Sequence, residues 1–283
     1  MLDLFEFPEL DRGVIRTIKK SIDTSFREFS RTYGDSIELF FYPLKVLMNW
    51  VEFTLVSAPW PLTMIFFVGV IFYFTRDKKL CVWSLLYIIF IGAFGLWQDT
   101  MYTLSLVLVS GWLSIIIGIP IGIWMAKNNT VKRLVNPILD IMQTIPIFVY
   151  LIPVVMLLGL GKIPGLIAMT IYAVPPIIRL TDLGIRQVDL GMREAALSLG
   201  MKPFQILHRI ELPLAKKSIL AGANQTTMMA ISMVVIASMI GVQGLGVPVL
   251  QAVQNQYIGS GIISGTAIVG LAIILDRVIQ NAK

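Results

Sequence analysis

The chain has 283 residues, of which 56% are hydrophobic and only 14% charged, and its mean hydropathy is +0.80. An ordinary soluble domain carries about 25% charged residues, so this composition excludes one and indicates an all-α integral membrane protein. The net charge of +6 is spread over short loops rather than along one stripe, which argues against a nucleic-acid partner. With one cysteine and one histidine, the chain offers neither an internal disulfide nor a structural metal site.

The first 57 residues differ from the rest of the chain. Residues 1–35 mix acids and bases with few aliphatic side chains, and we expect a loose tail there. Residues 36–57 have a helical pattern in which Glu38, Lys45 and Glu52 are spaced by seven and share one stripe. This pattern favours an amphipathic helix in the membrane interface. The alternative, an eighth span, would place the amino terminus inside.

Seven apolar segments approach the roughly 20 residues that cross the hydrocarbon of a bilayer. The predicted spans are residues 58–74, 80–97, 100–125, 137–160, 164–180, 218–240 and 261–275. Residues 245–258 are moderately apolar but interrupted by a proline and several amides. We expect them to form an external re-entrant or interfacial segment.

The charges of the loops predict the orientation of these spans. Lys and Arg recur in the loops after the first, third and fifth spans, whereas residues 241–260, after the sixth span, contain neither. By the positive-inside rule, the amino terminus lies outside and the carboxyl terminus inside. Residues 181–217, which we call the signature loop, then lie in the cytoplasm.

The signature loop has the pattern of two helices joined by a sharp turn. Asp189 is placed to cap the first helix, and Gly200 supplies a left-handed stop after it. A second amphipathic helix starts near Phe204, and Pro213 is predicted to end or kink it before the sixth span. A small helix with a smooth surface could insert into a groove of another protein.

The spacing within this loop matches a known pattern. Glu-Ala-Ala, three residues, Gly, nine residues and Ile-x-Leu-Pro are represented by Glu194, Ala195, Ala196, Gly200, Ile210, Leu212 and Pro213. The pattern resembles the signature loop of permease subunits of ATP-binding-cassette (ABC) importers. The resemblance implies that the loop docks on a separate ATPase subunit and couples it to the spans. The alternative is a structural helix-turn-helix without a partner.

The resemblance extends over most of residues 99–279. The segments similar to the glycine betaine/proline/choline permease branch are 143–146, 149–153, 172–179, 183–187, 232–237 and 273–277. The chain departs from the family at 241–246, where a smaller residue is often found, and residues 1–57 carry no specific match. The resemblance implies a type I ABC importer permease fold, with two accessory spans at 58–98 and the transporter core at 99–283.

Nothing in the sequence supplies an energy source or a reaction. The nearest approach to a phosphate loop, at residues 159–162, lacks the leading Gly and the final Ser or Thr. His208 lies in the second helix of the signature loop and is read as a loop residue rather than a catalytic one. We therefore expect no catalytic residue, metal or cofactor on this chain, and ATP with Mg²⁺ on a partner.

The resemblance also implies the partners of the chain. They are two copies of an ABC ATPase, an external solute-binding protein, a second permease copy and the lipid of a bacterial inner membrane. The implied function is import of quaternary-amine compatible solutes, such as glycine betaine, proline betaine or choline, by alternating access. An importer of another small solute such as an amino acid is one alternative. An ion-coupled secondary transporter is another, but of the carboxylates it would need at the midplane only Asp140 comes near.

Polar residues within the spans are candidates for the translocation path, because intramembrane polar groups are costly and often functional. The candidates are Asp140, Gln143 and Thr144 at the start of the fourth span, and Asn224, Gln225 and Thr226 in the sixth. Hydrogen bonding between helices is the alternative role for each. Asp140 could also complement the positive end of its own helix dipole.

Overall fold

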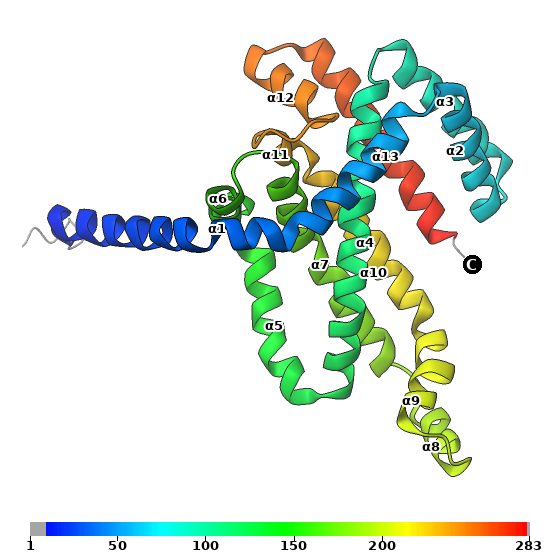
Figure 1. The fold of residues 1–283 in the computed structure, drawn as a ribbon. Coiled ribbons are helices and arrows are strands. Elements are labelled where there is room, and N and C mark those ends of the chain that lie inside the picture. The colour runs from blue at the N-terminus through cyan, green and yellow to red at the C-terminus, as the bar shows by residue number, and fades with distance from the viewer. Residues whose placement is uncertain (1–9, 282–283) are drawn as a thin grey trace, which may run out of the picture.

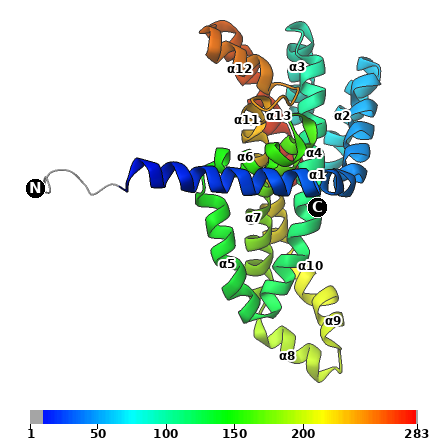
Figure 2. The same cartoon turned by 60° about the vertical axis from the view of Figure 1, so that its left-hand side comes forward.

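The computed structural model describes residues 10–281, which form helices and no strand (Figures 1 and 2). The expected all-α class is therefore confirmed. The amino-terminal half contains α1 (Arg12–Ser57), α2 (Trp60–Thr75), α3 (Lys78–Ala93), α4 (Trp97–Lys127), α5 (Asn129–Thr144) and α6 (Ile147–Leu158). The carboxyl-terminal half contains α7 (Lys162–Arg186), α8 (Leu190–Ser198), α9 (Pro203–Ile206), the π-helical turn η1 (Leu207–Glu211), α10 (Leu212–Ser232), α11 (Val234–Ser238), α12 (Gly246–Asn255) and α13 (Ile258–Gln280).

The centre of the molecule is formed by α7, which packs against α4 on one side and α10 on the other. Glycines allow this close approach. A Cβ on Gly118 of α4 would lie 2.3 Å from Cγ2 of Ile177, and one on Gly222 of α10 would lie 3.1 Å from the Cα of Ile177. Further along, a Cβ on Gly184 would lie 2.7 Å from the Cβ of Ser218. Small residues bring helix backbones together in membranes, where burial of apolar surface gives little driving force.

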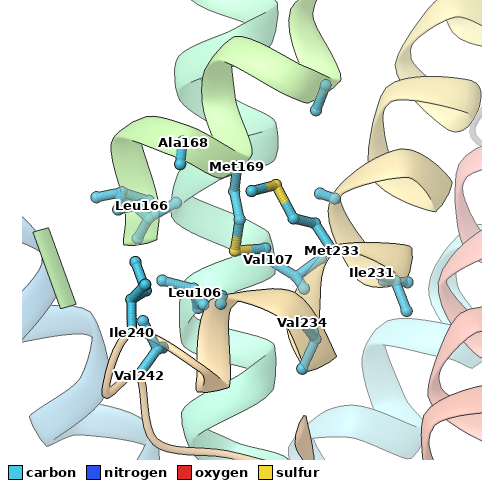
Figure 3. Close-up of a cluster of buried hydrophobic side chains, with 14 of the residues drawn as sticks. Leu106, Val107, Leu166, Ala168, Met169, Ile231, Met233, Val234, Ile240 and Val242 are labelled. Carbon is cyan, nitrogen blue, oxygen red and sulfur yellow. The ribbon is translucent and has the colours of Figure 1, made fainter. Parts of the chain in front are cut away.

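A buried apolar cluster joins α4, the start of α7 and the segment around α11 (Figure 3). Its labelled members are Leu106, Val107, Leu166, Ala168, Met169, Ile231, Met233, Val234, Ile240 and Val242. A Cβ on Gly165 would lie 2.3 Å from Cγ2 of Val242, so the chain after α11 folds back tightly against α7. The predicted span 218–240 lies largely within the continuous helical stretch 203–238, in which α10 stops at Ser232 and α11 follows directly after Met233.

The other predicted spans are also helical, with different limits. Among residues 10–281, the helices long and apolar enough to cross a bilayer are α1, α4, α7, α13 and the continuous stretch 203–238. The helices α2 and α3 have only 16 residues each, fewer than the roughly 20 that cross hydrocarbon. Crossing by this hairpin stays a prediction, as does the division of the chain at 57 and 98.

The fourth predicted span, 137–160, is wrong as a single helix. Its first part, α5, begins earlier, at Asn129, and meets α6 at an angle of 95°. Pro146 has no N–H to continue the helical ladder, and the preceding Ile145 has the extended backbone that a following proline favours. The result is a long vertical helix with a short crosswise one at its end (Figure 1).

The prediction of a loose tail at 1–35 is wrong for residues 12–35, and residues 1–9 lie outside the described part of the chain. The side chain of Asp11 accepts a hydrogen bond from the amide of Gly13 at 2.9 Å and caps α1. Apolar residues then recur every three or four positions at Ile15, Ile18, Ile22, Phe26 and Phe29. The helix predicted at 36–57 is therefore confirmed, but it is the second half of a 46-residue helix.

Only one end of the charged stripe predicted on α1 faces the core, because Glu38 and Lys45 are exposed and pair with each other at 3.4 Å. The Glu52 carboxylate forms an ion pair with Lys162 at the start of α7, and Met48 is buried against the central cluster. Figures 1 and 2 show α1 running crosswise to α4 and α5. The interrupted apolar segment at 245–258, predicted to be re-entrant or interfacial, contains the short helix α12, at the opposite end of the molecule from α8 (Figure 1).

Candidate functional site

The signature loop forms a projecting tip at the end of the molecule where α4 turns into α5 (Figures 1 and 2). Its first helix, α8, is capped as predicted, since the Asp189 carboxylate accepts from the amide of Met192 at 3.2 Å. Gly200 has a φ of 73°, so the predicted left-handed stop is also confirmed. The amide of Met201 closes the turn by donating to the carbonyl of Ala196 at 3.1 Å.

The second helix of the loop differs from the prediction. Pro203 opens α9, which has four residues and passes into the π-helical turn η1. Pro213 does not end this helix, because it lies in the first turn of α10, directly after η1 in the continuous helical stretch 203–238. The irregularity lies one turn earlier, where the amide of Leu212 donates to the carbonyl of Leu207 in a π-type bond.

The signature residues divide between the surface of the tip and its interior. Glu194, Ala195 and Gly200 are exposed, whereas Ala196 is buried. Ile210 and Leu212 are half-buried where η1 joins α10. The ring of His208 stacks on Phe204 with centroids 5.5 Å apart, as expected of a loop residue.

The projecting tip carries several large apolar side chains that are exposed, although the signature loop is rich in charged residues. These are Leu190, Met192, Leu197, Leu199 and Phe204, each more than half exposed. Exposed apolar groups gathered on one projection mark a protein–protein contact. The signature loop therefore presents an exposed apolar surface at one end of the molecule.

Behind the tip lie two buried carboxylates that sequence reasoning missed. Glu211, only 1% exposed, has Oε2 2.5 Å from Lys127 Nζ at the end of α4 and Oε1 3.1 Å from Arg193 Nε of α8. Glu211 occupies the unspecified position of Ile-x-Leu-Pro, so the pattern passed over it. The sequence signal that could have identified Glu211 is an acidic residue in a loop that is rich in Lys and Arg.

Asp182 of α7 is the second buried carboxylate. It lies 2.7 Å from Lys132 Nζ of α5 and 2.7 Å from Arg186 Nε one turn along its own helix. Arg186 also donates to the carbonyl of Met125 in α4 at 2.6 Å. The ends of α4, α5 and α7 are thus joined by charge as well as by packing.

The candidate path residues occupy two helices, α5 and α10, with α7 between them (Figure 1). On α10, Asn224 donates to Asp276 of α13 at 2.6 Å, Gln225 is exposed, and Thr226 is buried, its hydroxyl having no hydrogen-bond partner among residues 10–281. A cavity of about 670 Å³ lies beside this group, and Lys217, Asn224, Gln225 and Gln280 are among the residues that line it. The structure therefore does not bring the two predicted groups together within one chain.

On α5, Asp140, Gln143 and Thr144 are all exposed. Asp140 lies near the carboxyl end of α5, so its predicted role at the positive end of a helix dipole is wrong, because that helix begins eleven residues earlier at Asn129. Its carboxylate is instead paired with Arg179 of α7, with Oδ1 2.5 Å from the guanidinium.

The structure is that of a helical membrane bundle with a projecting, partly apolar loop at one end. The model of the binding-protein-dependent transport system inner membrane component matches residues 118–281, and the chain belongs to this family. It is therefore a multi-pass inner-membrane permease subunit, not an enzyme, that works with an ATPase and a solute-binding protein.

Relatives match beyond the limits of that family model. The chain is 47% identical over 234 residues to the glycine betaine/carnitine transport permease protein GbuB of Listeria monocytogenes, covering 82% of each chain. It is 46% identical over 238 residues to the glycine betaine/proline betaine permease ProW of Escherichia coli, covering 84% of this chain and 67% of that one. It is 41% identical over 262 residues to the glycine betaine permease OpuAB of Bacillus subtilis, covering 93% of each.

The fold also matches a solved transporter. A chain of the inward-facing MetNI methionine ABC transporter superposes with a TM-score of 0.56 at 24% identity, covering 64% of this chain and 93% of that one. The expected type I ABC permease fold is confirmed.

Proposed function

We propose that this chain is the permease of an ATP-driven importer of small quaternary-amine compatible solutes. The observation that carries the proposal is the set of relatives named for glycine betaine transport, at 41–47% identity over 82–93% of the chain. Relatives named for trimethylamine N-oxide and for choline transport are more distant, at 36% and 34% identity. All these solutes carry a methylated nitrogen, which defines the substrate class.

We place the solute path along the polar face of α5. Asn129, Arg133, Asn136, Asp140 and Gln143 follow one another at alternating spacings of four and three and so share one face of the helix. Asp140 is 63% exposed even though it is paired. A charged face does not point into hydrocarbon, so this face lines a watery path or meets a second copy of the chain.

The two charges beside this face suit a zwitterion. Arg179 would attract a solute carboxylate, and Asp140 would attract a quaternary ammonium, from positions that are now occupied by each other. Gln143 and Thr144 extend this face, while Asn224, Gln225 and Thr226 supply a second polar group on α10. Two copies of the chain, facing one another, would enclose such a path on all sides.

The signature loop is proposed as the coupling element. Its exposed residues Glu194, Ala195 and Gly200, with the apolar side chains around them, would dock on one ATPase subunit. Two permeases would engage two ATPases, which bind the ATP and Mg²⁺. By linkage, the loop must make different contacts in the two states of the ATPase if it is to bias the path.

The same geometry supports a proposed orientation in the membrane. The α4–α5 turn and the signature loop lie at one end of the molecule, and α12 lies at the other (Figures 1 and 2). Since the first end carries the predicted cytoplasmic bases, we propose that α12 faces outside, where a loaded binding protein docks. The crosswise α1 would then lie in the external interface with its amino terminus outside.

Reconstitution tests this function. The chain, its ATPase and its binding protein are placed in proteoliposomes, and uptake of labelled glycine betaine, choline, carnitine and methionine is measured with and without internal ATP. We expect ATP-dependent uptake of one or more of the three methylated amines and none of methionine. Uptake that persists without the ATPase would contradict the proposal in favour of a secondary transporter.

A further inference from the structure

We propose that Glu211, with Lys127 and Arg193, forms an ionic clasp that transmits displacements of α8 into α4 as well as into α10. The chain itself joins α8 to α10 only through α9 and η1, and this covalent route does not reach α4. The clasp does, because one carboxylate holds the last residue of α4 with one oxygen and a residue of α8 with the other. The inference rests on the proposed coupling role of the signature loop.

Arg193 is the residue on α8 from which the connection starts. Its guanidinium lies 3.1 Å from Glu211 and also donates to the carbonyl of Ile185, in the last turn of α7. One side chain of the coupling helix thereby reaches α7 directly and α4 through Glu211. Glu194 and Ala195, which belong to the recognised pattern, are instead exposed.

The burial of Glu211 is what makes the connection stiff. Its side chain is 1% exposed, whereas those of Lys127 and Arg193 are 41% and 27% exposed. If an ion pair breaks, the Lys127 or Arg193 side chain can be solvated by water, whereas the Glu211 carboxylate cannot. Since an unpaired buried charge is strongly unfavourable, a displacement of α8 that carries Glu211 along must draw Lys127, and with it the end of α4, in the same direction.

The second buried carboxylate shows that this connection is specific. Asp182 pairs with Lys132 and Arg186, on α5 and α7. Asp182 therefore connects helices of the transmembrane bundle to one another, whereas Glu211 connects the bundle to α8, the proposed coupling helix. The π turn that ends at Glu211 agrees with this role, since such turns recur at functional sites.

The test compares Lys127→Met with two matched variants in the complete complex with its ATPase and binding protein. Lys127→Arg keeps the charge, and Lys216→Met removes a charge from an exposed lysine that has no ion pair within residues 10–281. Uptake and ATP hydrolysis are measured together in proteoliposomes, per assembled complex. We expect Lys127→Met to lower the solute imported per ATP hydrolysed about tenfold. The same ratio should stay close to that of the unsubstituted complex in Lys127→Arg and in Lys216→Met.

A distance measurement separates transmission from mere stability. In a Cys81→Ser background, spin labels at Ser198→Cys and Thr130→Cys report the separation of α8 from the α4–α5 turn. With the clasp intact, we expect this distance to stay constant between nucleotide-free and ATP-bound complexes, and to change in Lys127→Met.

The inference is overturned if Lys127→Met imports as much solute per ATP as Lys216→Met, or if it only reduces the amount of assembled complex. It is also overturned if the labelled distance responds to ATP equally in both proteins. A complex without substitutions that shows no ATP-driven uptake would instead contradict the proposed function, so the two failures are distinguishable.

Discussion

The core built by α4, α7 and α10 and the accessory helices α1–α3 are stabilised in different ways. Of the most apolar 18-residue window of α7, 67% is buried, against 6% for the corresponding window of α1. The core uses glycines and buried charges at helix contacts, whereas α2 and α3 present large side chains such as Phe66, Tyr73 and Trp83 to their surroundings. Identical substitutions in the two regions should therefore have different effects.

The largest contrast is expected between two aspartates. Asp182→Asn leaves Lys132 and Arg186 without their shared carboxylate and should destabilise the protein by about 3 kcal/mol. Asp77 caps α3 by accepting from the amide of Lys79 at 2.8 Å, and asparagine is an equally good cap. Asp77→Asn should leave stability unchanged. Thermal unfolding of the detergent-solubilised protein checks both; equal losses would show that the buried pairs contribute little.

Two glycines give the next contrast. A Cβ on Gly122 of α4 would lie 2.6 Å from the Cβ of Thr181 and 2.7 Å from the carbonyl oxygen of Ile178, and Gly122→Ala should cost about 2 kcal/mol. A Cβ on Gly69 of α2 meets nothing within 4 Å, so Gly69→Ala should stabilise its helix by about 0.5–1 kcal/mol. Denaturant titration measures both, and the same sign for the two variants would refute the contrast.

A third contrast concerns two glycines of nearly equal backbone conformation. Gly200, after α8, and Gly95, between α3 and α4, have φ of 73° and 71°, and a Cβ on either would meet nothing within 4 Å. Valine is strained at both positions. Only Gly200→Val should distort the proposed docking knob and uncouple ATP hydrolysis from uptake, by about tenfold. Assays in proteoliposomes decide; unaltered coupling in Gly200→Val would contradict the role of the loop.

Features that have a local physical cause could be predicted from the sequence. Caps and stops such as Asp189 and Gly200 act within one turn, so their residue types are enough to predict them. The break between α5 and α6 also has a local cause, Pro146, but a proline alone does not distinguish a kink from a right-angled break.

Long-range pairing is what the sequence does not contain. Glu211 gains its meaning from Lys127, which lies 84 positions earlier and reaches it only because α7 and α10 bring the two ends together. The helix at 12–35 was missed because its charges suggested a tail, although its apolar residues keep a helical spacing. Local sequence patterns therefore predict the helices and their ends, whereas the ion pairs of Glu211 could be identified only from the packed structure.

The smallest contrast tests how the accessory hairpin is held to the core. The hydroxyl of Tyr87 on α3 donates to the carbonyl of Ala267 on α13 at 2.7 Å. A Cβ on Gly270 would lie 2.4 Å from the Tyr87 ring, which shows how closely α13 receives it. Tyr87→Phe keeps this packing and removes one hydrogen bond, so it should cost about 1 kcal/mol. Tyr73→Phe on α2 is the control, because Tyr73 is 78% exposed and forms no hydrogen bond within the described part of the chain. Thermal unfolding compares them, and a loss in Tyr87→Phe no larger than in Tyr73→Phe would mean that ring packing alone holds the hairpin against α13.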